Sequence, residues 1–212
     1  MRKFIFTMWI LIAAAVPALS LPVNGRVRIT GRPAGANVPT IVYAENLGGG
    51  RAQPGQFDLA QRQKTFGQRV LVVPAGSTVN FPNEDLIFHN VFSLSRPGPF
   101  DLGLYRAGSS KSRVFSEPAA YRVFCNIHPQ MAATILVVPT SYYVEADSSG
   151  SYRLDLPAGR YRVTAWSERS EPSSVEITVG SDVPELALDE AKFVATQHKN
   201  KFEQSYPKSA MR

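Results

Sequence analysis

The chain has 212 residues, of which 44% are hydrophobic and 19% are charged, and its formal net charge is +6. This composition is too apolar for a disordered chain, and the length suits one or two compact domains with a hydrophobic core. One cysteine and three histidines exclude an intramolecular disulfide, a multi-cysteine zinc site and any site that needs four or more imidazoles.

The first 20 residues have the pattern of a secretory signal peptide. Arg2 and Lys3 precede an apolar run over residues 4–16, and small residues lead to an expected cleavage site between Ser20 and Leu21. The alternative is a single membrane anchor, but the run is shorter than the roughly 20 residues that span a bilayer. We therefore expect an exported or periplasmic protein with no membrane span after cleavage.

The charge of the remaining chain does not favour a nucleic-acid partner. Without the leader, 21 basic and 17 acidic residues remain, and the net charge falls to +4. These charges form no concentrated Lys/Arg run, whereas nucleic-acid binding depends on a basic patch or stripe. We expect no nucleic-acid partner.

The chain after the leader has the pattern of short strands separated by clusters of Gly, Pro, Asn and Ser. A strand over 70–73 meets the turn 74–76, and alternation resumes over 78–81, which predicts a hairpin or a tight corner between two strands. Many short strands at this spacing, with almost no helical periodicity, indicate an all-β sandwich or barrel. The strands expected up to residue 138 are 26–30, 40–44, 70–73, 78–81, 89–94, 113–116, 120–125 and 134–138.

A change of composition at Pro139 indicates a second, smaller β module. Its expected strands are 151–156, 160–164 and 173–179. In the tail, apolar residues spaced among charged ones over 186–204 predict a short surface helix, in which His198 is solvated. The predicted organisation is a leader over 1–20, a first β-sandwich over 21–138, a small β module over 139–181 and a tail with a short helix over 182–212.

The stretch with the most chemical content lies between two predicted strands. Cys125, His128 and Met131 stand at the spacing Cys-x2-His-x2-Met, and His89 opens a strand 36 residues earlier. One thiolate, two imidazoles and one thioether are the donors that select copper, with the thioether as a weak axial ligand of a blue-copper site. Sulfur suits Cu(I) and imidazole suits Cu(II), so such a site changes oxidation state with little rearrangement, as fast electron transfer requires.

Two plainer interpretations stay open. In the first, Cys125 is a small buried apolar residue, Met131 fills the core and the histidines lie in loops by coincidence. That interpretation leaves unexplained why the only cysteine and two of the three histidines fall at strand ends. In the second, cysteine and histidine hold zinc. The methionine argues against zinc, because a thioether is a poor ligand for it.

Residues 70–138 resemble the cupredoxin family, in particular the plastocyanin-like and amicyanin-like blue copper proteins. The matching segments are VVPAGSTVNFPN over 72–83, the pair His89-Asn90, and YRVFCNIHPQM with AATILVV over 121–138. The short Cys-x2-His-x2-Met loop is the amicyanin-like version. The resemblance implies a cupredoxin-like Greek-key β-sandwich.

The same resemblance implies one type 1 copper ion and assigns its ligands. The strong ligands would be His89, Cys125 and His128, and Met131 would be the axial ligand. Asn90, after the first histidine, would tie the ligand-bearing strands together by hydrogen bonds. The alternative for Asn90 is an ordinary turn residue.

A second resemblance concerns the tail side of the chain. DSSGSYRLDLPAGRYRVTAW over 147–166 is similar to carboxypeptidase-regulatory or transthyretin-like β modules, and GRPAGANVPTIVY over 31–43 resembles the opening of such a module. An alternative organisation therefore pairs residues 27–44 with the second module, and the copper domain is then inserted within it.

These observations predict an exported blue copper protein that transfers single electrons between redox partners such as a cytochrome or a dehydrogenase. The alternatives are a copper-binding or copper-delivery protein without a redox circuit, and a structural β module whose metal supports the fold. We do not expect an enzyme, because multicopper oxidases and copper nitrite reductases need histidine clusters that three histidines cannot supply.

Overall fold

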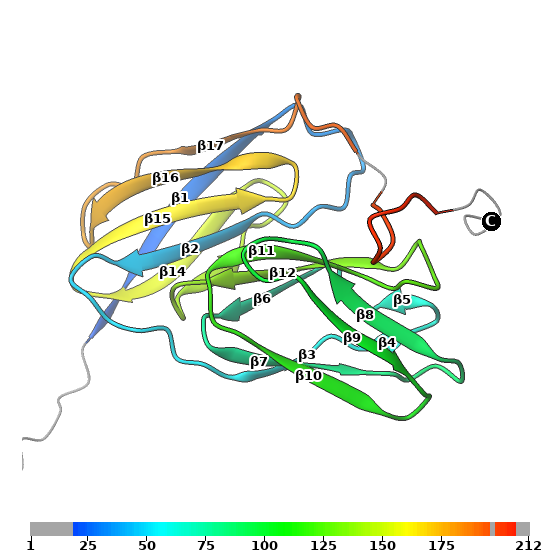
Figure 1. The fold of residues 1–212 in the computed structure, drawn as a ribbon. Helices are drawn as coiled ribbons and strands as arrows, with labels where there is room; N and C mark the ends of the chain where they lie inside the picture. Colours follow the sequence, from blue (N-terminus) through cyan, green and yellow to red (C-terminus); the bar gives the residue numbers. More distant parts are fainter. Residues whose placement is uncertain (1–18, 196–197, 207–212) are drawn as a thin grey trace, which may run out of the picture.

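Two β-sandwiches stacked on each other make up the computed structural model, which describes residues 19–195 and 198–206 (Figure 1). Every regular element in these residues is a strand. The predicted leader, residues 1–20, falls almost entirely outside the described residues. Within the described part, no helix has the length and apolar character needed to cross a membrane.

The first sandwich, drawn in cyan and green in Figure 1, contains a five-stranded and a three-stranded sheet. The five-stranded sheet has the order β6 (Val70–Pro74), β12 (Ala132–Val138), β11 (Ala119–Phe124), β8 (His89–Ser93) and β9 (Phe100–Tyr105). The three-stranded sheet has the order β10 (Ser110–Phe115), β7 (Ser77–Pro82) and β3 (Gln56–Asp58). A small hairpin pairs β4 (Gln61–Arg62) with β5 (Thr65–Phe66), and Gln61 bridges to Asn83, just after β7.

The core of this sandwich follows from two-residue alternation. In β7, Val79 and Phe81 are fully buried between half-buried neighbours, and β10 and β11 contribute Phe115 and Val123 to the same cluster. The turn after β6 contains Gly76 at φ +87°, a conformation that glycine adopts without steric strain. Because β6 and β7 lie in different sheets, this turn is a corner between sheets and not a hairpin.

The second sandwich also contains two sheets. One has the order β14 (Ser151–Pro157), β1 (Ser20–Thr30) and β17 (Leu186–Asp189). The other has the order β13 (Tyr143–Glu145), β2 (Ile41–Asn46), β15 (Arg160–Ser167) and β16 (Ser170–Thr178). Its core includes Val27, Leu156, Tyr161 and Leu186.

The first two strands belong to this second sandwich, which corrects the predicted division at residue 139. β1 pairs antiparallel with β14, and β2 lies between β13 and β15. The assignment of residues 21–138 to one unit is therefore wrong for β1 and β2, and the alternative pairing of residues 27–44 with the second module holds. The physical reason is that residues 139–181 contain too few strands to cover both faces of a core.

The tail contributes a strand where a helix was expected. In β17, Leu186 and Leu188 are 0% and 1% exposed and alternate with exposed residues, and the strand pairs parallel with β1. The prediction of a short helix over 186–204 is wrong, since the described residues of that range contain none. An alternation of two residues buries both leucines in a strand, whereas a helix would separate them around its axis.

The two sandwiches share an apolar interface. Ile41 and Trp166 from the second sandwich pack with Val70, Leu136 and Val138 from the first. This interface covers the β6 and β12 side of the five-stranded sheet.

Replacement of Leu188 tests the strand assignment of the tail. We expect Leu188→Ala to lower the free energy of unfolding by about 2–4 kcal/mol, because a fully buried leucine leaves a cavity. Urea denaturation measures this change. The control Ala187→Ser, at an exposed position of the same strand, changes stability by less than about 0.5 kcal/mol. Equal losses for the two variants would contradict the alternation.

Candidate metal centre

Three side chains from neighbouring strands meet at one end of the five-stranded sheet. His89 is the first residue of β8, Cys125 directly follows β11, and His128 lies in the loop that leads to β12. The Cys125 Sγ atom lies 3.8 Å from Nδ1 of His89 and 3.7 Å from Nδ1 of His128, and the two Nδ1 atoms are 3.2 Å apart. The three predicted strong ligands are therefore brought together.

These separations fit donors that share one metal ion. Bond lengths of about 2.0–2.1 Å for imidazole nitrogen and about 2.3 Å for thiolate place two donors of one ion roughly 3.3–3.8 Å apart. The two nitrogen–sulfur separations fall at the upper end of this interval, which corresponds to wide angles of about 120° at the ion. The separation of 3.2 Å between the two nitrogens lies just below it, which corresponds to a narrower angle of roughly 100°. Within the described residues, His89, Cys125 and His128 are the only group of three such donors gathered closely enough to hold an ion.

The centre is buried on one side and reaches the surface on the other. His89 and Cys125 are fully buried, whereas His128 is half-buried. Burial lowers the pKa of His128, and the charge of the neighbouring His89 lowers it further. A lowered pKa keeps the imidazole of His128 neutral near pH 7, which is the form that binds metal.

Met131 closes the ligand loop, defined here as residues 125–131. The Cys125 amide donates to the Met131 carbonyl at 3.2 Å, and the Met131 amide donates to the His128 carbonyl at 2.9 Å. The Met131 side chain is fully buried in the same core cluster as Cys125. Its role as axial ligand stays a prediction.

Asp85 holds the His89 ring, a contact that the sequence reasoning missed. Its Oδ2 atom lies 2.8 Å from His89 Nε2, so the His89 Nδ1 atom is left facing the other donors. The Asp85 carboxylate also accepts hydrogen bonds from the amides of Gln63 and Lys64, whose positive φ values aim both amides at it. Partial burial raises the pKa of Asp85, but these hydrogen bonds outweigh it and leave the pKa below its usual value. The spacing of four residues before His89 was the only sequence signal for this contact.

Asn90 ties β8 to the ligand loop, as the resemblance implied. This buried side chain donates to Asp101 Oδ1 at 2.6 Å and accepts a hydrogen bond from the Asn126 amide at 3.3 Å. It therefore joins the strand that carries His89 to the residue after Cys125. Contacts of this kind orient metal ligands before the metal binds.

His198 is not the solvated residue that the tail prediction placed there. Its ring is half-buried and stacks on Phe124, with centroids 3.9 Å apart and planes at 13°. The prediction failed because it treated the tail as an exposed helix, whereas the tail folds back over the metal centre.

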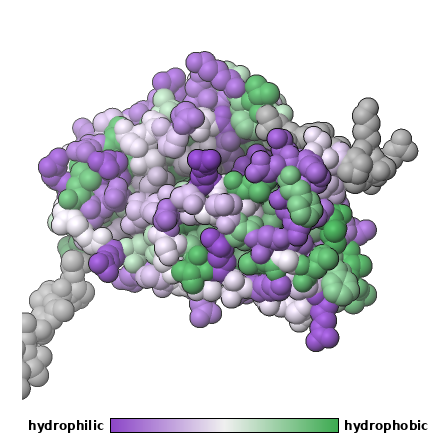
Figure 2. Space-filling view, viewed as in Figure 1, coloured by the Kyte–Doolittle hydropathy of each residue, from purple (hydrophilic) through white to green (hydrophobic). Residues whose placement is uncertain are grey.

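Several residues next to the histidine ligands in the sequence have exposed apolar side chains. Leu86 and Phe88, just before His89, are 97% and 58% exposed, and Ile127, next to His128, is 44% exposed. In the space-filling view, hydrophobic surface gathers at the right-hand end of the first sandwich (Figure 2). Each of these three residues therefore lies within three positions of His89 or His128 in the sequence and is exposed.

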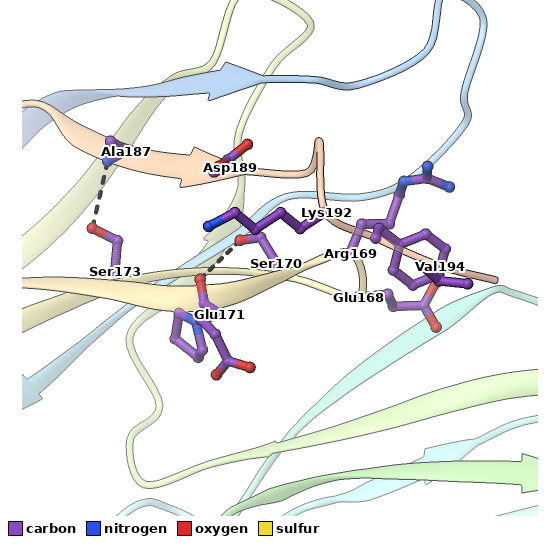
Figure 3. A pocket seen from close by; sticks show the side chains of 11 residues that line it. Glu168, Arg169, Ser170, Glu171, Ser173, Ala187, Asp189, Lys192 and Val194 are labelled. Carbon is purple, nitrogen blue, oxygen red and sulfur yellow. Dashed lines mark hydrogen bonds between the residues drawn. The ribbon is translucent and has the colours of Figure 1, made fainter. Parts of the chain in front are cut away.

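A second concavity lies away from the metal centre, on the second sandwich. Figure 3 shows this groove of about 700 Å³ between the β15–β16 turn and β17. Two of its serines bond the backbone: Ser173 accepts from the Ala187 amide, and Ser170 donates to the Glu171 carbonyl.

Comparisons with known proteins give structural likenesses at low coverage. No protein-family model matches the chain, and no curated protein matches it. Among solved structures, the chain is similar to a copper-containing nitrite reductase from Thermus scotoductus SA-01, with 27% identity over 44% of this chain and 25% of that one, at a TM-score of 0.38.

It is also similar to a purple cupredoxin from Nitrosopumilus maritimus, with 23% identity over 40% of this chain and 99% of that one, at a TM-score of 0.35. Amicyanin from Paracoccus versutus matches with 21% identity over 39% and 81% of the two chains, at a TM-score of 0.37. The resemblance of residues 147–166 to transthyretin-like modules stays a prediction.

Removal of the Asp85 carboxylate tests its role in holding His89. We expect Asp85→Ala to weaken metal binding by about 10–100-fold, because the His89 ring loses the partner that fixes its orientation. Titration of the apo protein with Co(II), followed by its thiolate absorption, measures the affinity. The control Asp58→Ala removes an exposed acid whose carboxylate accepts a hydrogen bond from Asn80, and it leaves the affinity unchanged. An unchanged affinity in Asp85→Ala contradicts the assignment.

The lowered pKa of His128 predicts how the apo protein responds to acid. The unfolded chain takes up this proton near the ordinary value of 6.5, and the folded protein takes it up only at lower pH. The contribution of neutral His128 to the free energy of unfolding is therefore complete above pH 6.5. It is lost as the pH falls through the pKa of His128 in the folded protein. NMR titration of the apo protein should give a His128 midpoint below 6.5, and His128→Gln should flatten the pH dependence of unfolding. A midpoint at or above 6.5 contradicts this expectation.

Proposed function

We propose that this protein carries single electrons on one copper ion held by His89, Cys125 and His128. The observation that supports the proposal is the convergence of two imidazole nitrogens and one thiol sulfur within 3.2–3.8 Å of one another. Copper bound by such donors exchanges one electron between Cu(I) and Cu(II). The protein then acts as a carrier and not as an enzyme.

Copper is favoured over zinc by the donor set. Two imidazoles and one thiolate, with a thioether as a weak fourth donor, are typical of blue-copper sites, whereas structural zinc sites are tetrahedral. Met131, fully buried in the core cluster that contains Cys125, is the proposed axial ligand. A soft, weak donor at this position suits copper and adds little to zinc binding.

The surrounding hydrogen bonds suit the low rearrangement that fast electron transfer needs. Asp85 fixes the His89 ring, and Asn90 fixes the backbone of Asn126 in the ligand loop. The donors are thereby restrained by the protein itself. A site restrained in this way changes little when the charge of its ion changes.

The electron would leave through His128. This imidazole is half-buried, whereas His89 and Cys125 are enclosed, so it offers the shortest route to the surface. The exposed apolar side chains of Ile127 and Phe88 would meet a redox partner there, of the cytochrome or dehydrogenase class. We place the protein outside the cytoplasm, on the leader pattern of residues 1–20.

Burial argues against the alternative of copper delivery. A protein that passes its ion to another must present soft donors to the recipient, but Cys125 and Met131 are both fully buried. The ligand loop is also closed by two backbone hydrogen bonds. This arrangement favours retention of the ion.

Copper reconstitution tests the proposal. We expect Cu(II) added to the apo protein to produce an intense visible absorption band from the Cu–thiolate bond, bleached by a mild reductant and restored by an oxidant. Cys125→Ser should bind without this band, and Met131→Leu should keep it, because the axial ligand is weak. A colourless wild-type complex, or a copper complex that does not exchange electrons with any small redox protein, would rule out electron transfer.

A further inference from the structure

The chain returns to the metal centre after β17. We call residues 198–206 the C-terminal strap; it is drawn in red beside the first sandwich in Figure 1. The strap contains no regular strand or helix. What fixes it is a set of contacts to the ligand loop and to the strands that flank the loop.

His198 makes the first of these contacts. Its Nε2 atom donates a hydrogen bond to the Pro129 carbonyl at 2.5 Å, and its ring stacks on Phe124, the residue before Cys125. One side chain therefore touches the chain on both sides of the ligand pair Cys125 and His128.

Lys201 makes the second contact. Its backbone amide donates to the Asn126 side chain at 3.1 Å, and its Nζ atom pairs with Asp101 at 2.7 Å. Asp101 is also the residue that receives the hydrogen bond from Asn90. The strap thus joins the same polar network that connects β8 to the ligand loop.

Tyr206 makes the third contact. Its hydroxyl donates to the Cys125 carbonyl at 3.3 Å, and its ring lies edge-on to His198, with centroids 5.2 Å apart. The side chain is buried, although it lies close to the end of the described chain. Burial of this side chain and its hydrogen bond to the Cys125 carbonyl indicate that the segment is docked on the ligand loop.

From these contacts we propose that the C-terminal strap is a positioning element that keeps the ligand loop closed over Cys125, with His198 and Tyr206 as its positioning residues. The carbonyls of Cys125 and Pro129 receive hydrogen bonds from the strap, and carbonyl groups shielded from water need such partners. Loss of these bonds leaves the loop free to open locally while the sandwich stays folded. The inference rests on the proposed function only in taking residues 125–131 to be the metal-holding loop.

The reactivity of Cys125 in the metal-free protein tests the inference. The protein has a single cysteine, so alkylation by iodoacetamide, followed by mass spectrometry, reports the opening of this one loop. We expect Tyr206→Phe to raise the alkylation rate roughly five-fold, as for loss of one hydrogen bond, and His198→Ala to raise it roughly ten-fold or more.

Two further variants make the result specific. His198→Gln keeps a donor for the Pro129 carbonyl and should recover most of the wild-type rate. Lys199→Ala alters an exposed strap residue and should leave the rate unchanged. The urea midpoint of all four variants should match that of the wild type within about 0.3 M, since the loop opens without global unfolding.

The inference is overturned by wild-type alkylation rates in both His198→Ala and Tyr206→Phe. It is also overturned if the variants are alkylated faster but their free energy of unfolding falls by the amount that accounts for the faster rate, because the cysteine is then exposed by global unfolding. Because this assay uses no metal, its outcome is independent of copper binding. If the strap variants are alkylated faster but the wild type develops no copper–thiolate band, the strap inference holds and the proposed function is refuted. If the wild type develops the band but the strap variants are alkylated at the wild-type rate, the proposed function holds and the strap inference is refuted.

The rate at which the metal-free protein takes up copper gives a second test. If the strap positions the loop, His198→Ala should accelerate the appearance of the copper–thiolate band after Cu(II) is added, because the open loop admits the ion. His198→Gln should restore the slower rate. Identical rates in the wild type and His198→Ala, with the band present in both, contradict a positioning role.

Discussion

The pairing of β8 with β11 is the constraint on which the metal centre depends. The two strands are antiparallel and place Phe92 opposite Phe124. The start of β8 and the end of β11 therefore lie at the same end of the sheet, and His89 meets Cys125 although 36 residues separate them. A slip of one residue would turn each of these side chains to the other face of the sheet. The packed core beneath Cys125 excludes that slip.

Much of the first sandwich and its donors could be predicted because rare residue types carried the signal. A single cysteine at fixed spacing from His128 and Met131 needs no knowledge of tertiary structure, and the alternation in β7 defines a strand by itself. β9 was missed since its Gly103 at φ +68° and an irregular register with β8 break the two-residue pattern. Asp85 was missed because a carboxylate four residues from a histidine is common, and only the fold shows that the two side chains touch.

The second sandwich could be predicted only in part, because its strands come from both ends of the chain. Residues 20–46 and 143–189 contribute to it, and the first sandwich lies between them in sequence. A change of composition marks where the chain leaves the first sandwich. It does not show that β1 and β2, which come earlier in the chain, belong to the second sandwich. The prediction for the tail failed for a similar reason. Leu186 and Leu188 fit either a strand or a helix until pairing with β1 selects a strand.

The position of the C-terminal strap in the sequence has a consequence for the order in which the centre is assembled. His198 follows its partner Pro129 by 69 residues. A polypeptide that emerges amino-terminus first completes His89, Cys125 and His128 well before the segment that covers them exists. During that interval the pocket stands uncovered, so an ion can enter a nascent protein more easily than a finished one.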